Sequence, residues 1–369
     1  MLKIYIRADA SLEIGTGHIM RCLSLAHAFR KAGSQVRFIN RVLQGNLIGH
    51  IEREGFKVLR LPYNISGGSP ATSRNANGTA FDQKSDARET LRLLAEDSSS
   101  AGLMITDHYS IGRLWESAVR PSVGRLMVID DSCSKQHYCD ILLDQDHLRG
   151  VRTLCGKKYV PNGCLKLLGI EYILLGGDFI KVRTHCQPKS GVVKSILVSM
   201  GGTDSSNETG KVLKALSGAA FQCIKIDVVV GEKNPNKARI KMLISRLKRF
   251  NFHCQANMAA LMSKADFAIV AGGMTAWEKC CMGLPGTITV TAKNQQAVAS
   301  FLDAQGAGLN LSYSDQLTAR DYADALSRLL TTPRVCRRQS EKGMRLIDGK
   351  GVLRVVKAVV DYMDLHGAC

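Results

Sequence analysis

Lys3-Ile4-Tyr5-Ile6-Arg7-Ala8 and the residues that follow it decide the fold of this chain. The six residues are mostly apolar and β-prone, and they predict a strand over 3–8. A polar, glycine-bearing loop over 9–17 comes next, and from His18 the apolar residues recur at helical spacing until Gly33 ends the helix. Gln35-Val36-Arg37-Phe38-Ile39 then begins a second strand. A strand, a helix and a strand in this order predict a parallel βαβ unit.

The same alternation continues along the 369 residues of the chain. This length exceeds one ordinary core, so we expect two domains, an N-terminal one at 1–160 and a C-terminal one at 161–369. The predicted fold class is α/β, with two Rossmann-like domains facing each other across a cleft. Further strands are expected at 57–61, 103–106, 126–129, 141–143, 195–200, 226–230, 267–270 and 287–290, and helices at 85–98, 113–117, 258–265, 275–282 and 352–365. The Gly-, Ser- and Asn-rich stretch 66–79 is expected to be a flexible loop.

Composition bounds the class of protein. Apolar residues make up 45% and charged residues 22% of the chain, as in globular proteins. No apolar run reaches the roughly 20 residues that span a bilayer, and the N-terminus lacks a signal peptide, so a cytoplasmic protein is expected. The 12 cysteines are scattered without a C-x-x-C pair, which favours reduced thiols over a metal site.

The formal net charge of +18 has two interpretations. Nucleic-acid binding requires a basic stripe with aromatic stacking positions, whereas an enzyme with anionic substrates gains from long-range steering. Basic residues are dispersed here and aromatic residues make up only 6%, so we favour small anionic substrates.

The loop before the first helix ends in Gly15-Thr16-Gly17-His18. Glycines let a backbone approach a ligand, and the N–H groups of a first helical turn favour negative charge. Histidine side chains exchange protons near neutral pH, so His18 is the candidate acid or base, and a helix-capping histidine is the alternative. The candidate ligand contacts here are Gly15, Gly17 and Arg21.

Two glycine turns follow strands of the second half. Gly201-Gly202 follows the strand at 195–200, and Gly272-Gly273 follows the strand at 267–270 and opens a helix. Such turns let a pyrophosphate reach a helix N-terminus. Glu278 lies one turn after Thr275 and is expected to accept hydrogen bonds from a ribose diol, with a capping box of these two residues as the alternative.

Polar residues also follow three other strands. Asn294-Gln295 comes after the strand at 287–290, and paired amides suit sugar hydroxyls or phosphates, or a helix N-cap. Tyr109, in Asp107-His108-Tyr109, is a candidate hydrogen-bond donor to a substrate. Asp130-Asp131 is expected either to orient His18 or only to hold its own loop.

Taken together, these stretches resemble the UDP-sugar hydrolases of pseudaminic acid biosynthesis, which act on UDP-2,4-diacetamido-2,4,6-trideoxy-β-L-altropyranose. This family lies within the MurG-like glycosyltransferase-B (GT-B) superfamily. The matching stretches run almost end to end and include Arg7-Ala8-Asp9-Ala10, 14–25, Asp107-His108-Tyr109, Ile129-Asp130-Asp131, 168–172, 198–204, 258–285 and Asn294-Gln295. The resemblance implies a GT-B fold, with a sugar-side histidine loop in the first domain and UDP binding in the second.

The resemblance also implies a reaction. Water attacks the anomeric carbon with inversion and UDP leaves, and no metal ion or other cofactor is required. The implied catalytic residues are His18 and Tyr109. The implied UDP-holding residues are Gly201, Gly202, Gly272, Gly273, Thr275, Glu278 and Asn294, with Gln295 beside them.

Two other functions stay open. A glycosyltransferase of the same fold would pass the sugar from UDP to an acceptor, and a non-enzymatic basic protein would bind nucleic acid in a salt-dependent manner. The sequence favours the hydrolase, with a UDP-linked diacetamido sugar as its partner. We expect no nucleic-acid or membrane partner and a monomeric chain.

Overall fold

The computed structural model describes residues 1–63, 81–97, 101–132, 135–148, 159–232, 234–245, 247–254 and 256–367. The chain forms two compact units, one of Met1–Gly176 with Lys350–Cys369 and the other of Gly177–Gly349. The loop expected over 66–79 lies outside the described residues.

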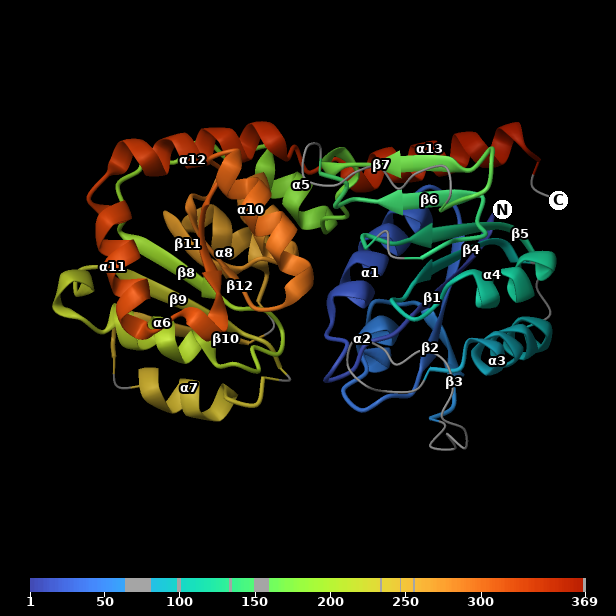
Figure 1. The fold of residues 1–369 in the computed structure, drawn as a ribbon, viewed down its shortest axis with the longest axis horizontal. Coiled ribbons are helices and arrows are strands. Elements are labelled where there is room, and N and C mark those ends of the chain that lie inside the picture. The colour runs from blue at the N-terminus through green and yellow to red at the C-terminus, as the bar shows by residue number, and fades with distance from the viewer. Residues whose placement is uncertain are drawn as a thin grey trace. The chain divides into compact units, whose positions relative to one another are not determined.

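The first unit is a parallel sheet with helices on both faces (Figure 1). Its strands are β1 (Lys3–Ala8), β2 (Gln35–Arg41), β3 (Lys57–Leu61), β4 (Ala101–Asp107), β5 (Val123–Ile129), β6 (Ile141–Asp144) and β7 (Leu165–Leu168). Its helices are α1 (Gly17–Lys31), α2 (Ile48–Arg53), α3 (Gln83–Glu96), α4 (Arg113–Val119) and α13 (Gly351–Leu365), with short 3-10 turns η1 (Arg120–Ser122) and η2 (Ile170–Tyr172). The strand order β3-β2-β1-β4-β5-β6-β7 reverses between β1 and β4, which makes that pair the topological switch point.

Strand β1 is buried on both faces of the sheet, which explains why most of its side chains are apolar. Successive side chains of a strand point to opposite faces, and both faces of this sheet are covered. Ile4 and Ile6 are buried in the core that α1 and α13 complete, whereas Tyr5 is buried in the core on the other face with Trp115 of α4. The strand therefore carries apolar side chains in both directions.

The second unit repeats this architecture. Its strands are β8 (Ser195–Ser199), β9 (Lys225–Val230), β10 (Phe250–Cys254), β11 (Phe267–Ala271), β12 (Gly286–Val290) and β13 (Leu309–Tyr313). Its helices are α5 (Gly177–Arg183), α6 (Glu208–Leu216), α7 (Lys237–Ile244), α8 (Met258–Lys264), α9 (Met274–Cys281), α10 (Gln296–Ala304), α11 (Ala319–Leu330) and α12 (Pro333–Leu346), with η3 (Ala219–Phe221), η4 (Lys293–Gln295) and η5 (Ser314–Gln316). The order β10-β9-β8-β11-β12-β13 puts the switch point between β8 and β11.

The division into units differs from the predicted boundary between residues 160 and 161. Strand β7 continues the first sheet because it pairs with β6, with Leu165 opposite Ile141. Helix α13 packs on α1, and its Val355 and Val359 are fully buried in the first core. Residues 161–176 thus belong to the first unit through β7, and the last helix belongs to it because the apolar face of α13 packs in the first core.

Close backbone contact between β8 and β9 gives a stability prediction. A Cβ atom on Gly231 would lie 1.9 Å from the carbonyl oxygen of Gly202, in one of the predicted ligand turns. Gly231→Ala is expected to destabilise the second unit by about 1–3 kcal/mol because the backbone must shift. Gly49→Ala is the control, since no atom beyond its chain neighbours and the backbone of its own helix lies within 4 Å of its Cβ position. Equal urea midpoints for Gly231→Ala and the wild type would contradict the prediction.

Candidate active site

The switch point of the first sheet brings the start of α1 beside the end of β4. His18 Nδ1 lies 2.6 Å from Oδ1 of Asp107, the last residue of β4. Arg21 binds both oxygens of the same carboxylate, through Nε and Nη2 at 2.6 Å each. Its Nη1 forms a further ion pair with Asp131. An imidazole and a guanidinium therefore share one buried aspartate.

The charge on Asp107 fixes the tautomer of His18. Burial alone would raise the pKa of Asp107, but the Arg21 guanidinium and the His18 imidazole outweigh burial and hold this pKa well below its usual value. An ionised carboxylate only accepts hydrogen bonds, so the hydrogen of neutral His18 lies on Nδ1 and Nε2 keeps its lone pair. The side chain does not cap α1, whose N-cap residue is Thr16 without a side-chain capping bond, so the capping alternative for His18 is wrong.

Arg21, predicted to contact a ligand, holds the carboxylate that orients His18. All of its hydrogen bonds and ion pairs that the described residues define go to Asp107 and Asp131. Its neighbours Gly15 and Gly17 have different requirements. Gly15 adopts a φ of +81°, which favours glycine, whereas Gly17 is the first residue of α1 with open space where a side chain would begin. Packing therefore does not require a glycine at 17.

Tyr109 lies against His18. The two ring centroids are 4.5 Å apart at an interplanar angle of 76°, so the rings meet edge to face. Tyr109 is 51% exposed, which leaves much of its ring open to solvent. Its backbone carbonyl accepts a hydrogen bond of 2.6 Å from Lys135 Nζ. The structure thus brings together the two predicted catalytic residues.

The Asp130-Asp131 pair does not contact His18. Asp130 accepts hydrogen bonds from the Ser132 amide and hydroxyl at 2.8 and 2.5 Å, and its other oxygen lies 2.8 Å from His137 Nε2. His137 Nδ1 lies 2.6 Å from Glu116, and although burial opposes the charge, these two carboxylates raise the pKa of His137 to about 9. Of the two predicted roles, Asp130 holds its loop. The residue that orients His18 is Asp107, which sequence reasoning missed as a site residue although its place at the end of β4 could have indicated it.

The switch point of the second sheet gathers the predicted nucleotide turns. Ser199 pairs with Val270, so the turns that follow β8 and β11 leave neighbouring strand ends. Gly201 has a φ of +90°, and a Cβ atom on Gly272 would lie 3.1 Å from Gln295 Cβ. The turns at 201–202 and 272–273 and the η4 segment therefore lie at one end of this sheet.

Glu278 does not form the alternative capping box with Thr275. Helix α9 has Gly273 as its N-cap and no side-chain capping bond, so that alternative is wrong. Glu278 is partly buried, and burial raises the pKa of its carboxyl to about 7. The next residue, Lys279, is fully buried and donates to the Ala307 carbonyl at 2.7 Å.

The amides of Asn294 and Gln295 have different positions. Gln295 Oε1 accepts from the amide and the hydroxyl of Thr291, both at 3.0 Å, so this side chain ties the turn after β12 to η4. Although Gln295 is the N-cap residue of α10, its side chain does not cap the helix. Asn294 lies on the exposed side of η4. Asp204, by contrast, caps α6, because its carboxylate accepts from the amides of Glu208 and Thr209 at 2.8 and 3.1 Å.

Glu278 gives a prediction about pH. Ribose hydroxyls donate to a carboxylate but not to both oxygens of a protonated acid, so UDP affinity is expected to rise between about pH 6 and 8 as Glu278 ionises. Glu278→Gln is expected to bind UDP about tenfold more weakly at pH 8 and to lose this part of the pH dependence. Calorimetric titration with UDP tests both effects, with Glu341→Gln on the surface of α12 as the control. Identical pH profiles for wild type and Glu278→Gln would refute the assignment.

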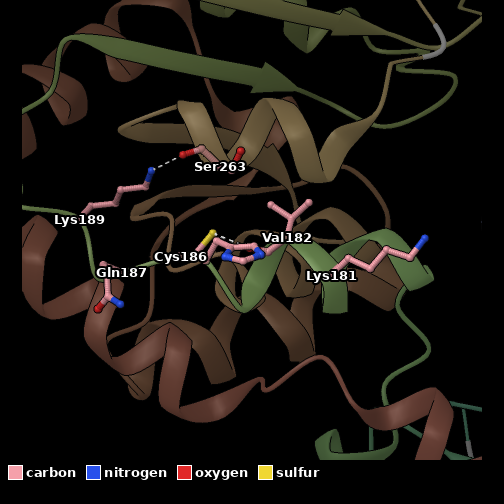
Figure 2. Close-up of a pocket in the computed structure, with 7 residues that line it drawn as sticks. Lys181, Val182, Cys186, Gln187, Lys189 and Ser263 are labelled. Carbon is pink, nitrogen blue, oxygen red and sulfur yellow. Dashed lines mark hydrogen bonds between the residues drawn. The ribbon is translucent and has the colours of Figure 1, made fainter.

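A cavity of about 690 Å³ lies elsewhere in the second unit, between α5 and α8 (Figure 2). It is lined by Lys181, Val182, His185, Cys186, Gln187, Lys189 and Ser263, and contains none of the predicted site residues. Lys189 Nζ donates to the Ser263 carbonyl across it at 2.7 Å. Over the described part of the chain, no three His, Cys, Asp or Glu side chains gather as metal ligands would, and no helix has the length and apolarity to cross a membrane.

The two switch-point sheets define a protein of the GT-B type. MurG of Acinetobacter baumannii matches 98% of this chain and 100% of its own, with a TM-score of 0.63 at 13% identity. The structure of LpCGTa in complex with UDP matches 98% of each chain, with a TM-score of 0.61 at 13% identity. These similarities confirm the predicted fold class of two Rossmann-like domains.

Relatives of known sequence point beyond the fold to an activity. The UDP-2,4-diacetamido-2,4,6-trideoxy-β-L-altropyranose hydrolase of Campylobacter jejuni is 25% identical over 316 residues, which cover 85% of this chain and 100% of that protein. The chain thus resembles this hydrolase at a distance, and the resemblance inferred from the motifs is confirmed.

Two further relatives match over part of their length. The spore coat polysaccharide biosynthesis protein SpsG of Bacillus subtilis is 29% identical over 208 residues, 56% of this chain and 61% of its own. An uncharacterised protein of Methanocaldococcus jannaschii is 28% identical over 294 residues, 77% of this chain and 54% of its own. The chain therefore spans little more than half the length of these two relatives. No protein-family model matches the chain.

Proposed function

We propose that this protein hydrolyses a UDP-linked diacetamido sugar, UDP-2,4-diacetamido-2,4,6-trideoxy-β-L-altropyranose or a close analogue, to UDP and the free sugar. The observation that carries the proposal is the pairing of His18 with the buried, ionised Asp107 at the carboxyl end of the first sheet. The distant resemblance to the Campylobacter hydrolase supports the choice of substrate. The GT-B fold supports the use of a nucleotide sugar.

His18 is suited to the role of general base. Its Nδ1–H donates to Asp107, which leaves the Nε2 lone pair to take a proton from water as the oxygen attacks the anomeric carbon. The negative carboxylate stabilises the imidazolium that forms, and Arg21 keeps that carboxylate ionised. The anomeric C–O bond breaks, the electron pair leaves with the UDP oxygen, and the proton on His18 passes to solvent.

Tyr109 is proposed to assist from beside the histidine. The edge of one ring against the other, with centroids 4.5 Å apart, limits the orientations open to the imidazole. The exposed part of the tyrosine can contact the sugar, since its hydroxyl both donates and accepts hydrogen bonds. Lys135 fixes the backbone that carries this side chain.

UDP is proposed to bind at the switch point of the second sheet. The backbone N–H groups of the turns at 201–202 and 272–273 and of the start of α9 would bind the pyrophosphate and stabilise its charge as it leaves. Thr275 and Asn294 would add polar contacts, and Glu278 would accept from the ribose diol. Open backbone at Gly201 and Gly273, where a Cβ atom would meet nothing closer than 3.7 Å, is consistent with close approach of a ligand.

The test is turnover in ¹⁸O-labelled water with no acceptor present. We expect UDP and free sugar in equal amounts, with the label in the sugar and not in UDP, because water attacks carbon. Label in the UDP phosphate would contradict attack at the anomeric carbon. Release of UDP only after an alcohol acceptor is added, with the sugar bonded to that alcohol, would favour the second candidate, a glycosyltransferase, which the similarity to MurG supports.

A further inference from the structure

Two cysteine thiols meet at the amino ends of β6 and β7, at the end of the first sheet opposite His18. Cys139 Sγ lies 3.8 Å from Cys164 Sγ, although the residues are 25 positions apart in the sequence. Register explains the approach, because Ile141 pairs with Leu165 and the amide of Leu165 donates to the carbonyl of Asp140 at 2.9 Å. The sheet itself therefore holds the two thiols together.

A tight turn presents Cys164. The Cys164 amide donates to the Pro161 carbonyl at 3.3 Å, and Gly163 between them has a φ of +87°. These values fit a type II β-turn, which favours glycine at its third position. Cys164 is partly exposed after this turn, whereas Cys139 is 4% exposed and packs in the core with Leu142. The residue that carries one thiol is thus partly exposed, and the other thiol is buried within 3.8 Å of it.

We propose that Cys139 and Cys164 form a reversible disulfide by exchange with small-molecule disulfides of the glutathione class. The Cys164 thiolate attacks one sulfur of the small disulfide, forms a mixed disulfide and releases the first small thiolate. Cys139 then gives up its proton and attacks the Cys164 sulfur, which expels the second small thiolate. Two protein thiols are oxidised, one small disulfide is reduced to two thiols, and the protons end on those thiols.

The local chemistry agrees with this order. The hydrogen bond with Cys139 lowers the pKa of the Cys164 thiol, and the nearby Lys166 charge acts in the same direction. The same contact and burial raise the pKa of Cys139. Because the thiolate is the nucleophile, Cys164 attacks first and Cys139 resolves the mixed disulfide.

The distance to be closed is short. A disulfide requires sulfur atoms about 2.05 Å apart and Cα atoms about 4.4–6.8 Å apart. The register puts Cys164 opposite Asp140, one residue from Cys139, so a strand spacing of about 4.8 Å and a rise of about 3.3 Å give a diagonal Cα separation of roughly 6 Å, within that range. Side-chain rotation therefore has less than about 2 Å to close from the observed sulfur separation.

Tryptic mapping provides the test, because the two thiols fall in peptides 136–149 and 159–166, each with a single cysteine. The folded full-length protein is incubated with oxidised glutathione, alkylated and digested without reduction. We expect the two peptides to be linked, lighter than their summed masses by two hydrogen atoms, and to separate after dithiothreitol. The exposed Cys223 is an internal control that should retain glutathione as a mixed disulfide.

Two variants separate the steps. Cys139→Ser should accumulate glutathione on peptide 159–166, because nothing resolves the mixed disulfide. Cys164→Ser should leave peptide 136–149 unmodified, because the remaining thiol is buried. The proposal is overturned if the wild-type protein retains glutathione on Cys164, if Cys164 links to Cys133 or Cys155 instead, or if neither peptide reacts while Cys223 does.

Discussion

His18→Ala protein is expected to release free sugar from the UDP-sugar about 10³-fold more slowly than the wild type, because a positioned general base contributes roughly this much. UDP affinity should stay within about twofold, since the proposed nucleotide contacts belong to the second unit. The measurement is kcat from sugar release, together with calorimetric titration of UDP.

His27→Ala is the matched control for this prediction. His27 lies nine residues further along the same helix and pairs with Glu54 at 2.9 Å, and its side chain is 41% exposed, unlike that of His18. Its removal should leave kcat unchanged. If His18→Ala turned over as fast as the wild type, the imidazole would have no part in the mechanism.

Asp107→Asn is expected to lower kcat by about 10²–10³-fold and to change the shape of the pH–rate profile. The amide cannot carry the charge that fixes the His18 tautomer and stabilises the imidazolium, although its size is nearly the same. The substitution also leaves the Arg21 guanidinium with one carboxylate instead of two, and loss of a buried partner costs about 3 kcal/mol of folding stability.

Asp130→Asn is the control that separates an effect of Asp107 on catalysis from an effect on folding stability. Asp130 is also buried and charged, and its ion-pair partner His137 does not contact His18. Asp130 itself has a pKa that His137 lowers to about 2 against the opposing effect of burial, so its removal should also destabilise the fold. A pH–rate profile that changes equally in both variants would argue that Asp107 acts only on stability.

The pattern of apolar residues predicted where most strands lie, but not which side chains contact one another. The strands at 3–8 and 57–61 have the predicted bounds, because alternating strands and helices leave clear periodic signals. Strand β7 was missed because its four residues lie beside an irregular stretch rich in Gly, Pro and Lys. The five-residue strands β10 and β13 were also missed, whereas the four-residue β6 was predicted, so strand length alone does not decide which strands the pattern reveals.

Contacts across long stretches of sequence explain what was missed in the candidate site. His18 was found from its place after a glycine loop, but its partner Asp107 is 89 positions away. Arg21 was predicted as a ligand contact from its place just after the glycine loop, with no sign of its carboxylate partners. Its two carboxylate partners lie 86 and 110 positions away, beyond any local pattern.

Arg7 is a similar case. Its place in a strand gave no sign of its surroundings, yet it is fully buried between Asp9 and Asp86. Its guanidinium contacts Asp9 at 2.7 and 2.8 Å and Asp86 at 2.7 and 3.1 Å. Buried charges persist when they are paired in this way, and sequence alone does not reveal the pairing.

Because α13 packs in the first unit, it affects when each unit can finish folding during synthesis. The Gly177–Gly349 segment is continuous and can condense as soon as it has been synthesised, whereas the other half lacks one wall of its core until Val355 and Val359 have left the exit tunnel. The half that is translated first is therefore completed last. Its seven strands and α1 are made early, but the part of the apolar face that α13 covers stays open until the last helix has been synthesised.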